Sequence, residues 1–203
     1  MAFERISRKG SKTARNRAHE LKCEVQSALK DRYTFTPIMV GSAKTNTIVA
    51  DDQGAFDVDF QFQISNSYTD DPNRIKNDFF VTFQNVTQSN EIIENSTTAI
   101  TIKVYTDESH RIELYSFDFV LIKNKNIIKG NGQNQYTWNI LPEYHLAYKI
   151  FDNIDEETKY DIIDNHIIPR KIIEKRKNSN IRKSSSDIFV EEVYNYAKTH
   201  KII

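Results

Sequence analysis

The clearest pattern in the chain is a strict alternation of apolar and polar side chains from Ala55 to Ile64, in the sequence A-F-D-V-D-F-Q-F-Q-I. Successive side chains on a β-strand point to opposite faces of the sheet. The alternation therefore predicts a strand whose aromatic face is turned to the core and whose polar face carries Asp57 and Asp59 side by side.

The segment before this strand predicts a helix and a further strand. Apolar residues at three- and four-residue steps indicate a helix from Ser11 to Leu29, with Ser11 as its N-cap. β-branched and aromatic residues predict a strand over Tyr33 to Val40, which leads into Gly41 and Ser42. The small polar residues that follow are typical of a turn that directs N–H groups and a hydroxyl toward phosphate oxygens.

The middle of the chain predicts a helix and a β-hairpin. Asp71-Pro72 is a typical helix start, a capping acid before a proline at the first helical position, and the helix is expected to continue through Phe83. Thr97 to Tyr105 and Arg111 to Ile122 are rich in strand-forming residues and predict two paired strands.

Asp118 is the informative residue of the second hairpin strand. It shares one face with Ser116 and Val120, opposite a face of large apolar side chains. A buried acid without a partner is costly, so it is expected to meet a cation, a metal ion or a hydrogen-bond donor. If the strand with Asp57 and Asp59 lies beside it, three carboxylates share one site.

The last third changes from a polar ribbon to helices. Lys123 to Thr137 predicts a ribbon with a turn at Gly130-Asn131-Gly132, interpreted as a lid or substrate loop. Helical periodicity then covers Glu143 to Phe151, Glu156 to Lys177 and Ser186 to Lys198. A basic loop before the last helix ends in three candidate N-caps, Ser184, Ser185 and Ser186.

Composition narrows the class of protein. A chain of 203 residues with 38% hydrophobic residues has enough apolar material for one good core. The single cysteine excludes an intrachain disulfide and a cysteine-based zinc cluster. No apolar run reaches membrane-spanning length, and the first residues have no signal-peptide core, so we expect a cytoplasmic protein without a membrane partner.

The net charge of zero conceals a segregation of charge along the chain. Residues 1–32 and 165–203 each carry a charge of +5, and the centre carries −10. Basic ends folded beside an acidic centre would suit a phosphorylated substrate whose metal ions lie on the central carboxylates. The alternative is that these charges lie on ordinary solvated helix faces. We interpret Arg15 and Arg17 in this way, as surface charges. Apart from the basic ends, nothing in the sequence supports a nucleic-acid activator.

Neighbouring acids on one strand face have two interpretations. Asp57 and Asp59 repel each other as bare anions, and a divalent cation such as Mg²⁺ would relieve that repulsion. Alternating acids also occur on the solvated face of an exposed strand. For Asp118 the corresponding alternative is a structural ion pair.

The order of these motifs resembles the DNA polymerase β-like nucleotidyltransferase superfamily. The chain has Gly41-Ser42, Asn46-Thr47, Asp57-Val58-Asp59 and a later strand acid, Asp118. The wording G-S-A-K-T-N-T-I-V is closest to the bacterial cGAS/DncV-like nucleotidyltransferases (CD-NTases) and their oligoadenylate-synthetase relatives, and the resemblance covers residues 10–125.

The resemblance implies an α+β fold of the polymerase β-like type, with a small mixed sheet carrying the carboxylates. Residues 1–142 would form the catalytic core, including the N-terminal helix, and residues 143–203 a C-terminal helical part packed on the same core. Members of the family are usually longer, and many have a bulkier residue where this chain has Ala43 after the G-S pair. These two departures concern the acceptor and the product rather than the metal ligands.

The resemblance also implies roles for particular side chains. Asp57, Asp59 and Asp118 would hold two Mg²⁺ or Mn²⁺ ions and act in catalysis. Gly41, Ser42 and Thr47 would contact the phosphates. A lysine and a serine on the family's later helices contact the donor triphosphate, and the residues available for these roles are Lys171 or Lys175 and Ser185 or Ser186.

The implied activity is transfer of a nucleoside monophosphate from ATP or another nucleoside triphosphate to a hydroxyl, with release of pyrophosphate. The G-S-x-x-x-N-T wording favours a linear or cyclic oligonucleotide second messenger in antiphage defence. The alternatives are modification of a protein, a tRNA or an antibiotic, and a nucleotide-binding module without activity. The intact carboxylates argue against the last. The sequence does not define the oligomeric state.

Overall fold

The computed structural model describes residues 3–131, 133, 135–141, 145–176 and 183–203. The strands are β1 (Tyr33–Met39), β2 (Phe56–Ser67), β3 (Glu91–Asn95), β4 (Ala99–Tyr105), β5 (Glu113–Lys123), β6 (Asn126–Gly130) and β7 (Tyr136–Ile140). The helices are α1 (Lys12–Leu29), α2 (Gly41–Thr45), α3 (Pro72–Val86), α4 (His145–Asn153), α5 (Glu156–Asp161), the π-helix η1 (Ile162–Ile167), α6 (Ile168–Lys175) and α7 (Ser185–Thr199).

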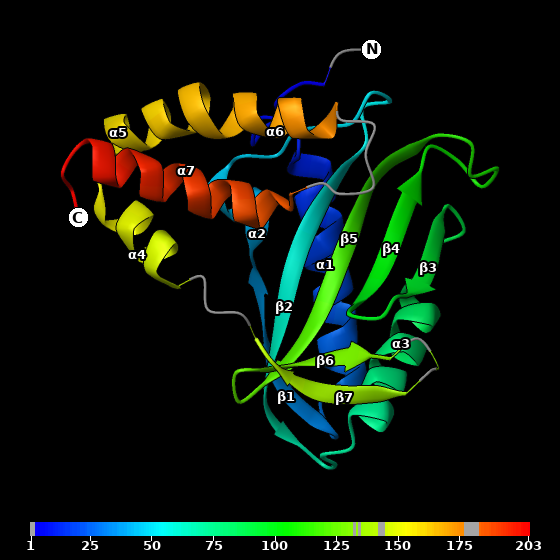
Figure 1. The fold of residues 1–203 in the computed structure, drawn as a ribbon. Coiled ribbons are helices and arrows are strands. Elements are labelled where there is room, and N and C mark those ends of the chain that lie inside the picture. The colour runs from blue at the N-terminus through cyan, green and yellow to red at the C-terminus, as the bar shows by residue number, and fades with distance from the viewer. Residues whose placement is uncertain (1–2, 132, 134, 142–144, 177–182) are drawn as a thin grey trace.

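The strands form one mixed sheet, in which β1, β2, β5, β4 and β3 lie in this order. β2 and β5 are parallel neighbours, whereas the other pairs are antiparallel. Figure 1 shows α1 and α3 behind the sheet, and α4 to α7 gathered beside α2 at one end of it. This arrangement is the predicted α+β architecture with an N-terminal helix and C-terminal helices.

The alternation in β2 places its aromatic residues against α1 and α3, as predicted. Phe62 is fully buried and contacts Phe79 and Phe83 of α3 at ring distances of 6.0 and 5.9 Å. Phe119 of β5 joins them, 4.5 Å from Phe83. Ring pairs at such distances add to the stabilisation from burial, so this face of the sheet holds β2 and β5 in register.

A second apolar cluster lies among the C-terminal helices. Its members come mainly from α4, η1, α6 and α7, and include Phe151, Ile167, Phe189 and Val193. Val49, between α2 and β2, belongs to the same cluster and joins these helices to the segment that carries the G-S pair. The predicted division between residues 142 and 143 lies outside the described residues and stays a prediction.

Two helix predictions differ from the structure in detail. The predicted helix from Glu156 to Lys177 is divided into α5, η1 and α6, and Lys177 lies outside the described residues. In η1 the N–H of Ile168 donates to the carbonyl of Ile163, five residues back, and Pro169 follows without an N–H of its own. A π-turn of this kind is a recognised adjustment of a helical hydrogen-bond ladder.

Ser11 occupies the N-cap position of α1, but its side chain does not cap the helix. The hydroxyl donates to the carbonyls of Ser7 and Arg8 and accepts from Nε of Arg15. The backbone of Ser11 has φ −89° and ψ 7°, whereas a capping residue has extended ψ values. The predicted capping role of Ser11 is therefore wrong.

The ribbon after β5 consists of two strands that pack against α3. Asn124 and Lys125 have positive φ and form the tight turn between β5 and β6. Tyr136 accepts from and donates to the side chain of Asn73 in α3. The ribbon lies at the end of the sheet remote from α2 (Figure 1), which does not fit the predicted lid. Gly132 of the predicted turn lies outside the described residues.

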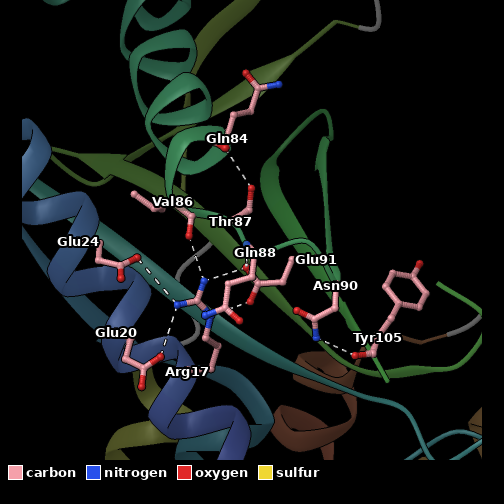
Figure 2. A network of polar contacts seen from close by, with 10 residues as sticks. All are labelled: Arg17, Glu20, Glu24, Gln84, Val86, Thr87, Gln88, Asn90, Glu91 and Tyr105. Carbon is pink, nitrogen blue, oxygen red and sulfur yellow. Dashed lines mark hydrogen bonds and ion pairs between the residues drawn. The ribbon is translucent and has the colours of Figure 1, made fainter. Parts of the chain in front are cut away.

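β3 was not predicted, and its first residue, Glu91, is joined to α1 by Arg17. The Arg17 guanidinium donates to both carboxylate oxygens of Glu91 at 2.6 and 2.8 Å, and to the carbonyl of Val86 at 3.1 Å. Figure 2 shows this network between α1 and the start of β3. Arg17 and Glu91 are both buried, so the interpretation of Arg17 as a surface charge is wrong.

Replacing Arg17 by Met is expected to lower the free energy of unfolding by about 3 kcal/mol, because it leaves the Glu91 carboxylate buried without its cation. Urea denaturation measures the loss. The double variant Arg17→Met/Glu91→Leu removes both charges and is expected to recover most of the lost stability. Glu20→Ala is the control, because Glu20 is exposed and a surface pair contributes about 0–1 kcal/mol. An equal loss in single and double variants would contradict this interpretation.

No helix in the described ranges has the length and apolar character needed to cross a membrane.

Candidate active site

The three predicted carboxylates lie on two adjacent strands. In the parallel pairing of β2 with β5, Asp59 lies directly opposite Asp118, and Asp57 lies opposite Ser116. All of these side chains belong to the polar face of the sheet, because they alternate with the buried aromatic positions. Asp59 and Asp118 are partly buried, and Asp57 is exposed. The fold thus brings together Asp57, Asp59 and Asp118, as expected from the sequence.

Two hydroxyl groups orient the outer carboxylates. Ser116 Oγ donates to Asp57 Oδ1 at 2.5 Å, and Thr101 Oγ1 of β4 donates to Asp118 Oδ1 at 2.6 Å. Sequence reasoning assigned no role to either residue. Ser116 was placed on the face of Asp118 by alternation, but its contact with Asp57 depends on the pairing of β2 with β5. Thr101 reaches Asp118 only because β4 pairs with β5 in this register.

Burial and neighbouring charges raise the pKa values of two of the three carboxylates. Burial, followed by the charges of Asp118 and Asp57, raises the pKa of Asp59 to about 7, and Lys171 partly opposes this rise. Burial also raises the pKa of Asp118, against the hydrogen bond from Thr101. At neutral pH the site therefore favours a proton on Asp59, mainly because this carboxylate is buried and also because Asp118 and Asp57 lie near it.

The donor set fits a hard divalent cation. Mg²⁺ takes oxygen ligands from one or two carboxylates and leaves other positions to water and phosphate. Throughout the described part of the chain, no three His, Cys, Asp or Glu side chains are already arranged to hold a metal ion. The carboxylates of Asp57 and Asp118 are instead directed to Ser116 and Thr101. The fit therefore rests on the three oxygen-donor side chains and their excess negative charge.

Gly41 permits the first turn of α2 to approach the carboxylates. Its φ is +59°, a conformation that is costly for residues with a Cβ atom. A Cβ at this position would lie 2.3 Å from Oδ2 of Asp59. The N–H of the preceding residue, Val40, donates to the carbonyl of Asp59 at 2.9 Å. The position therefore requires glycine for its backbone conformation and also for its distance from Asp59.

Lys171 of α6 connects the C-terminal helices to the G-S-x-x-x-N-T segment. Its Nζ donates to Ser42 Oγ at 2.8 Å and to Thr47 Oγ1 and Thr47 O at 2.9 and 3.0 Å. Lys175, one turn later, donates instead to the carbonyl of Val49 at 2.7 Å. Of the two lysines considered from the sequence, the structure places Lys171 at Ser42.

The N-terminus of α7 completes this part of the site. Ser184 is the N-cap, and its hydroxyl accepts from the N–H of Asp187. A narrow crevice beside it, too small to hold a water molecule, is lined by Gly41, Ser42, Thr45, Thr47, Tyr148, Lys171, Ser185, Ser186 and Phe189. Because helix N-termini present free N–H groups and a partial positive charge, the lining is suited to phosphate oxygens.

The surroundings of Lys171 make its charge responsive to pH. Burial, with a smaller contribution from Lys175, lowers its pKa to about 7, and the charge of Asp59 opposes this change. An added phosphate would favour the protonated form. Lys171 is therefore a cation that an anionic ligand would stabilise.

The pH dependence of stability should reveal this lysine. Between pH 7 and the ordinary lysine pKa of 10.5, the unfolded state binds more protons at this position than the folded state. The free energy of unfolding is therefore expected to rise with pH in this range. Urea denaturation at pH 7 and pH 9 should show a contribution on the order of 1–2 kcal/mol that is absent in Lys171→Met. The control is Lys198→Met, because Lys198 is an exposed residue of α7. This variant should retain the rise in the free energy of unfolding with pH, and loss of the rise in this control would contradict the assignment.

No family model matches this sequence. No curated protein matches it either. Among solved structures, the Bradyrhizobium diazoefficiens CD-NTase CdnG in complex with GTP is similar with a TM-score of 0.62 and 11% identity, covering 89% of this chain and 64% of CdnG.

E. coli MS115-1 CdnC with ATP is similar with a TM-score of 0.53 and 13% identity, covering 94% of this chain and 62% of that one. The same CdnC in a complex with HORMA-deltaN gives a TM-score of 0.54 at 12% identity, with 94% and 61% covered. The chain has the CD-NTase fold. This fold was predicted from the G-S, D-x-D and Asp118 motifs, and the prediction is confirmed. The chain spans less than two thirds of the length of these CD-NTase structures.

Proposed function

We propose that this chain with a CD-NTase fold is a metal-dependent nucleotidyltransferase. The observation that carries the proposal is the position of Asp59 directly opposite Asp118, with Asp57 on the same face and Gly41 against Asp59. The crowding of negative charge suits a divalent cation, and the adjacent Lys171, Ser42 and α7 N-terminus suit phosphates. The polar face of β2 and β5, together with α2, Lys171 of α6 and the α7 N-terminus, thus supplies the two kinds of binding that a metal-bound nucleoside triphosphate requires.

The residues that would hold the metal are Asp57, Asp59 and Asp118. Two Mg²⁺ or Mn²⁺ ions bound there would neutralise phosphate charge and lower the pKa of an attacking hydroxyl. Ser116 and Thr101 would keep the outer carboxylates oriented. To bind a metal ion, Asp59 would have to lose the proton that its raised pKa favours. The affinity of the site for the metal is therefore expected to increase from pH 6 to pH 8.

The proposed reaction forms a bond between a hydroxyl oxygen and the α-phosphorus of the triphosphate. The bond between the α-phosphorus and the bridging oxygen to the β-phosphorus breaks, its electron pair leaves with pyrophosphate, and the hydroxyl proton is released to water. Ser42, Thr47 and protonated Lys171 would hold the leaving phosphates, with Ser185 and Ser186 beside them. Preorganised donors of this kind stabilise charge that develops on the leaving group.

The proposed donor is ATP or GTP, and the proposed acceptor is a second nucleotide. Similarity to CdnG in complex with GTP and to CdnC with ATP supports a purine triphosphate. The motif wording supports a linear or cyclic oligonucleotide product and a role in antiphage defence. The product belongs to the proposal because likeness of fold alone does not assign an acceptor.

The test is incubation of the protein with the four ribonucleoside triphosphates and Mg²⁺ or Mn²⁺, followed by mass spectrometry of the products. The Asp57→Asn/Asp59→Asn double variant is the control. We expect an oligonucleotide that only the native protein makes. Pyrophosphate release without an oligonucleotide, or a nucleotide added to a macromolecule, would redirect the proposal to the modification of another acceptor. Absence of any triphosphate consumption with both metals and all four nucleotides would contradict the proposal.

Binding can be tested separately from turnover. Mg²⁺ with a non-hydrolysable ATP or GTP analogue is expected to raise the melting temperature, because a ligand at 100 times its Kd stabilises the folded state by about 2.7 kcal/mol. Thermal denaturation with the analogue and EDTA is the control, and it should show a smaller rise. Equal melting temperatures with and without saturating analogue would exclude an open triphosphate site.

A further inference from the structure

A second cavity, of about 280 Å³, lies beside the candidate active site and shares Thr45 with it. It is lined by Lys44, Thr45 and Asn46 of the α2 segment, together with residues from the N-terminal segment, α4, α5 and η1. None of the three aspartates lines it, nor do Ser42 and Lys171. The functional assignment of the carboxylates therefore leaves this cavity unexplained.

The polar lining of the cavity carries an excess of positive charge. Lys159 and Glu156 pair with each other at 2.8 Å. Arg8 and Lys44 form no ion pair with any acid among residues for which the structure gives positions, and Asp152 is the remaining acid of the lining. The lining thus presents two cations against one carboxylate.

Arg8 also lies near a second guanidinium, that of Arg15, which does not line the cavity. The pKa of Arg15 is lowered mainly by its burial and to a smaller extent by the charge of Arg8. An anion beside Arg8 would offset this repulsion. Arginine is also the side chain best suited to bind phosphate through two parallel hydrogen bonds.

Apart from Thr45 and Asn46, the rest of the lining is apolar and aromatic. Phe151 and Ile163 are buried at 6% and 5% exposure and form part of the wall, whereas Tyr160 is 57% exposed. Pockets for small molecules usually measure about 300–1,000 Å³ and combine an apolar lining with a few polar groups. A cavity of about 280 Å³ lies just below this range, which limits its occupant to a small molecule.

We propose that this cavity binds a small ligand that carries a phosphate and an aromatic or apolar part, for which AMP serves as the probe. Arg8 and Lys44 would hold the phosphate, and Phe151, Ile163 and Tyr160 would contact the apolar part. Because the lining includes α2 and α5, a bound ligand would connect the helix that carries Gly41 and Ser42 to the C-terminal helices. The inference does not depend on the proposed enzymatic activity.

The test is calorimetric titration of the full chain with AMP in EDTA, so that metal-dependent binding at the carboxylates does not contribute. The native protein is expected to bind AMP more tightly than adenosine or inorganic phosphate. The variant Arg8→Gln/Lys44→Gln is expected to weaken AMP binding at least tenfold, since it removes two charge-assisted hydrogen bonds. Both side chains are exposed, so the variant is expected to keep the native melting temperature.

Two further variants locate the binding. Lys149→Gln removes an exposed positive charge from α4 that does not line the cavity, and it should leave the Kd for AMP unchanged. Ser42→Ala should also leave it unchanged. No binding of AMP to the native protein at millimolar concentration, an unchanged Kd in Arg8→Gln/Lys44→Gln, or loss of binding in Ser42→Ala would each overturn the proposal.

Discussion

Asp59→Asn is expected to lower the kcat of nucleotidyl transfer by about 10³-fold or more, because it removes a charged oxygen ligand from the centre of the proposed metal site. Asp59 is the carboxylate that lies beside both Asp57 and Asp118, and Gly41 brings α2 against it. Its loss would therefore affect both proposed metal ions. The measurement is the rate of product formation from ATP and GTP with saturating Mg²⁺.

The same substitution is expected to leave stability unchanged or increased in the absence of metal. The pKa of Asp59 rises from 3.8 to about 7 on folding, so that between these pH values the folded state binds more protons at this position than the unfolded state. Its contribution to the free energy of unfolding is therefore present below pH 4 and is lost as the pH rises toward 7. The neutral amide of Asn does not titrate, and the variant should lack this decline.

The control for Asp59→Asn is Asp52→Asn, in the exposed loop before β2. It also removes one carboxylate, and it should leave both kcat and melting temperature close to native. Circular dichroism during heating in EDTA measures the stability of each variant. A large fall in the melting temperature of Asp59→Asn would show that Asp59 is a structural acid and would withdraw it from the proposed metal site.

Gly41→Ala is expected to lower kcat by about 10²-fold or more and to reduce the free energy of unfolding by about 1–3 kcal/mol. A single added methyl group acts in two ways here. It is unfavourable at a φ of +59°, and it would lie 2.3 Å from Oδ2 of Asp59, so that either α2 or the carboxylate must move. Displacement of a proposed metal ligand explains the effect on turnover.

Gly54→Ala separates these two causes. Gly54 also has a positive φ, +93°, but a Cβ at that position would meet no atom within 4 Å. This variant is expected to lose about 1 kcal/mol of stability through backbone strain, with turnover unchanged. Urea denaturation and product formation are compared for both variants. Equal kcat values for Gly41→Ala and Gly54→Ala would mean that the distance between Gly41 and Asp59 does not matter for catalysis.

Local patterns in the sequence determine most of the elements of this fold. Alternation over residues 55–64 identifies the buried face of β2, and the Asp71-Pro72 start identifies α3, whose cap the structure contains. These features depend on neighbouring residues only, because strand and helix periodicity and capping are properties of short segments. The position of Asp57 and Asp59 on one face of β2 also follows from this local periodicity.

The sequence also indicates the phosphate-binding segment, through the order of the G-S pair, the N-T pair and the D-x-D strand. Resemblance to the CD-NTases connects these motifs with Asp118, although the segments between the motifs are long and varied in sequence. Here the inference comes from comparison of motifs rather than from periodicity. It agrees with the parallel pairing that places Asp59 opposite Asp118.

Contacts between distant segments depend on tertiary structure alone. Lys171, and not Lys175, contacts Ser42 because of the way α6 is rotated after the π-turn. The two lysines lie one helical turn apart, and the sequence patterns around them are similar. Arg17 and Glu91 are 74 positions apart, and no local pattern distinguishes their buried pair from solvated charges.

The hydroxyl donors of the site also depend on tertiary structure and not on local sequence. Ser116 and Thr101 each lie on an ordinary strand face, and their contacts with Asp57 and Asp118 arise from strand register. Register is decided by the packing of the aromatic core across β2, β5 and α3, and not by the residues that form the site. The sequence by itself therefore determined the elements and their motifs, whereas the folded core decided which polar side chains meet.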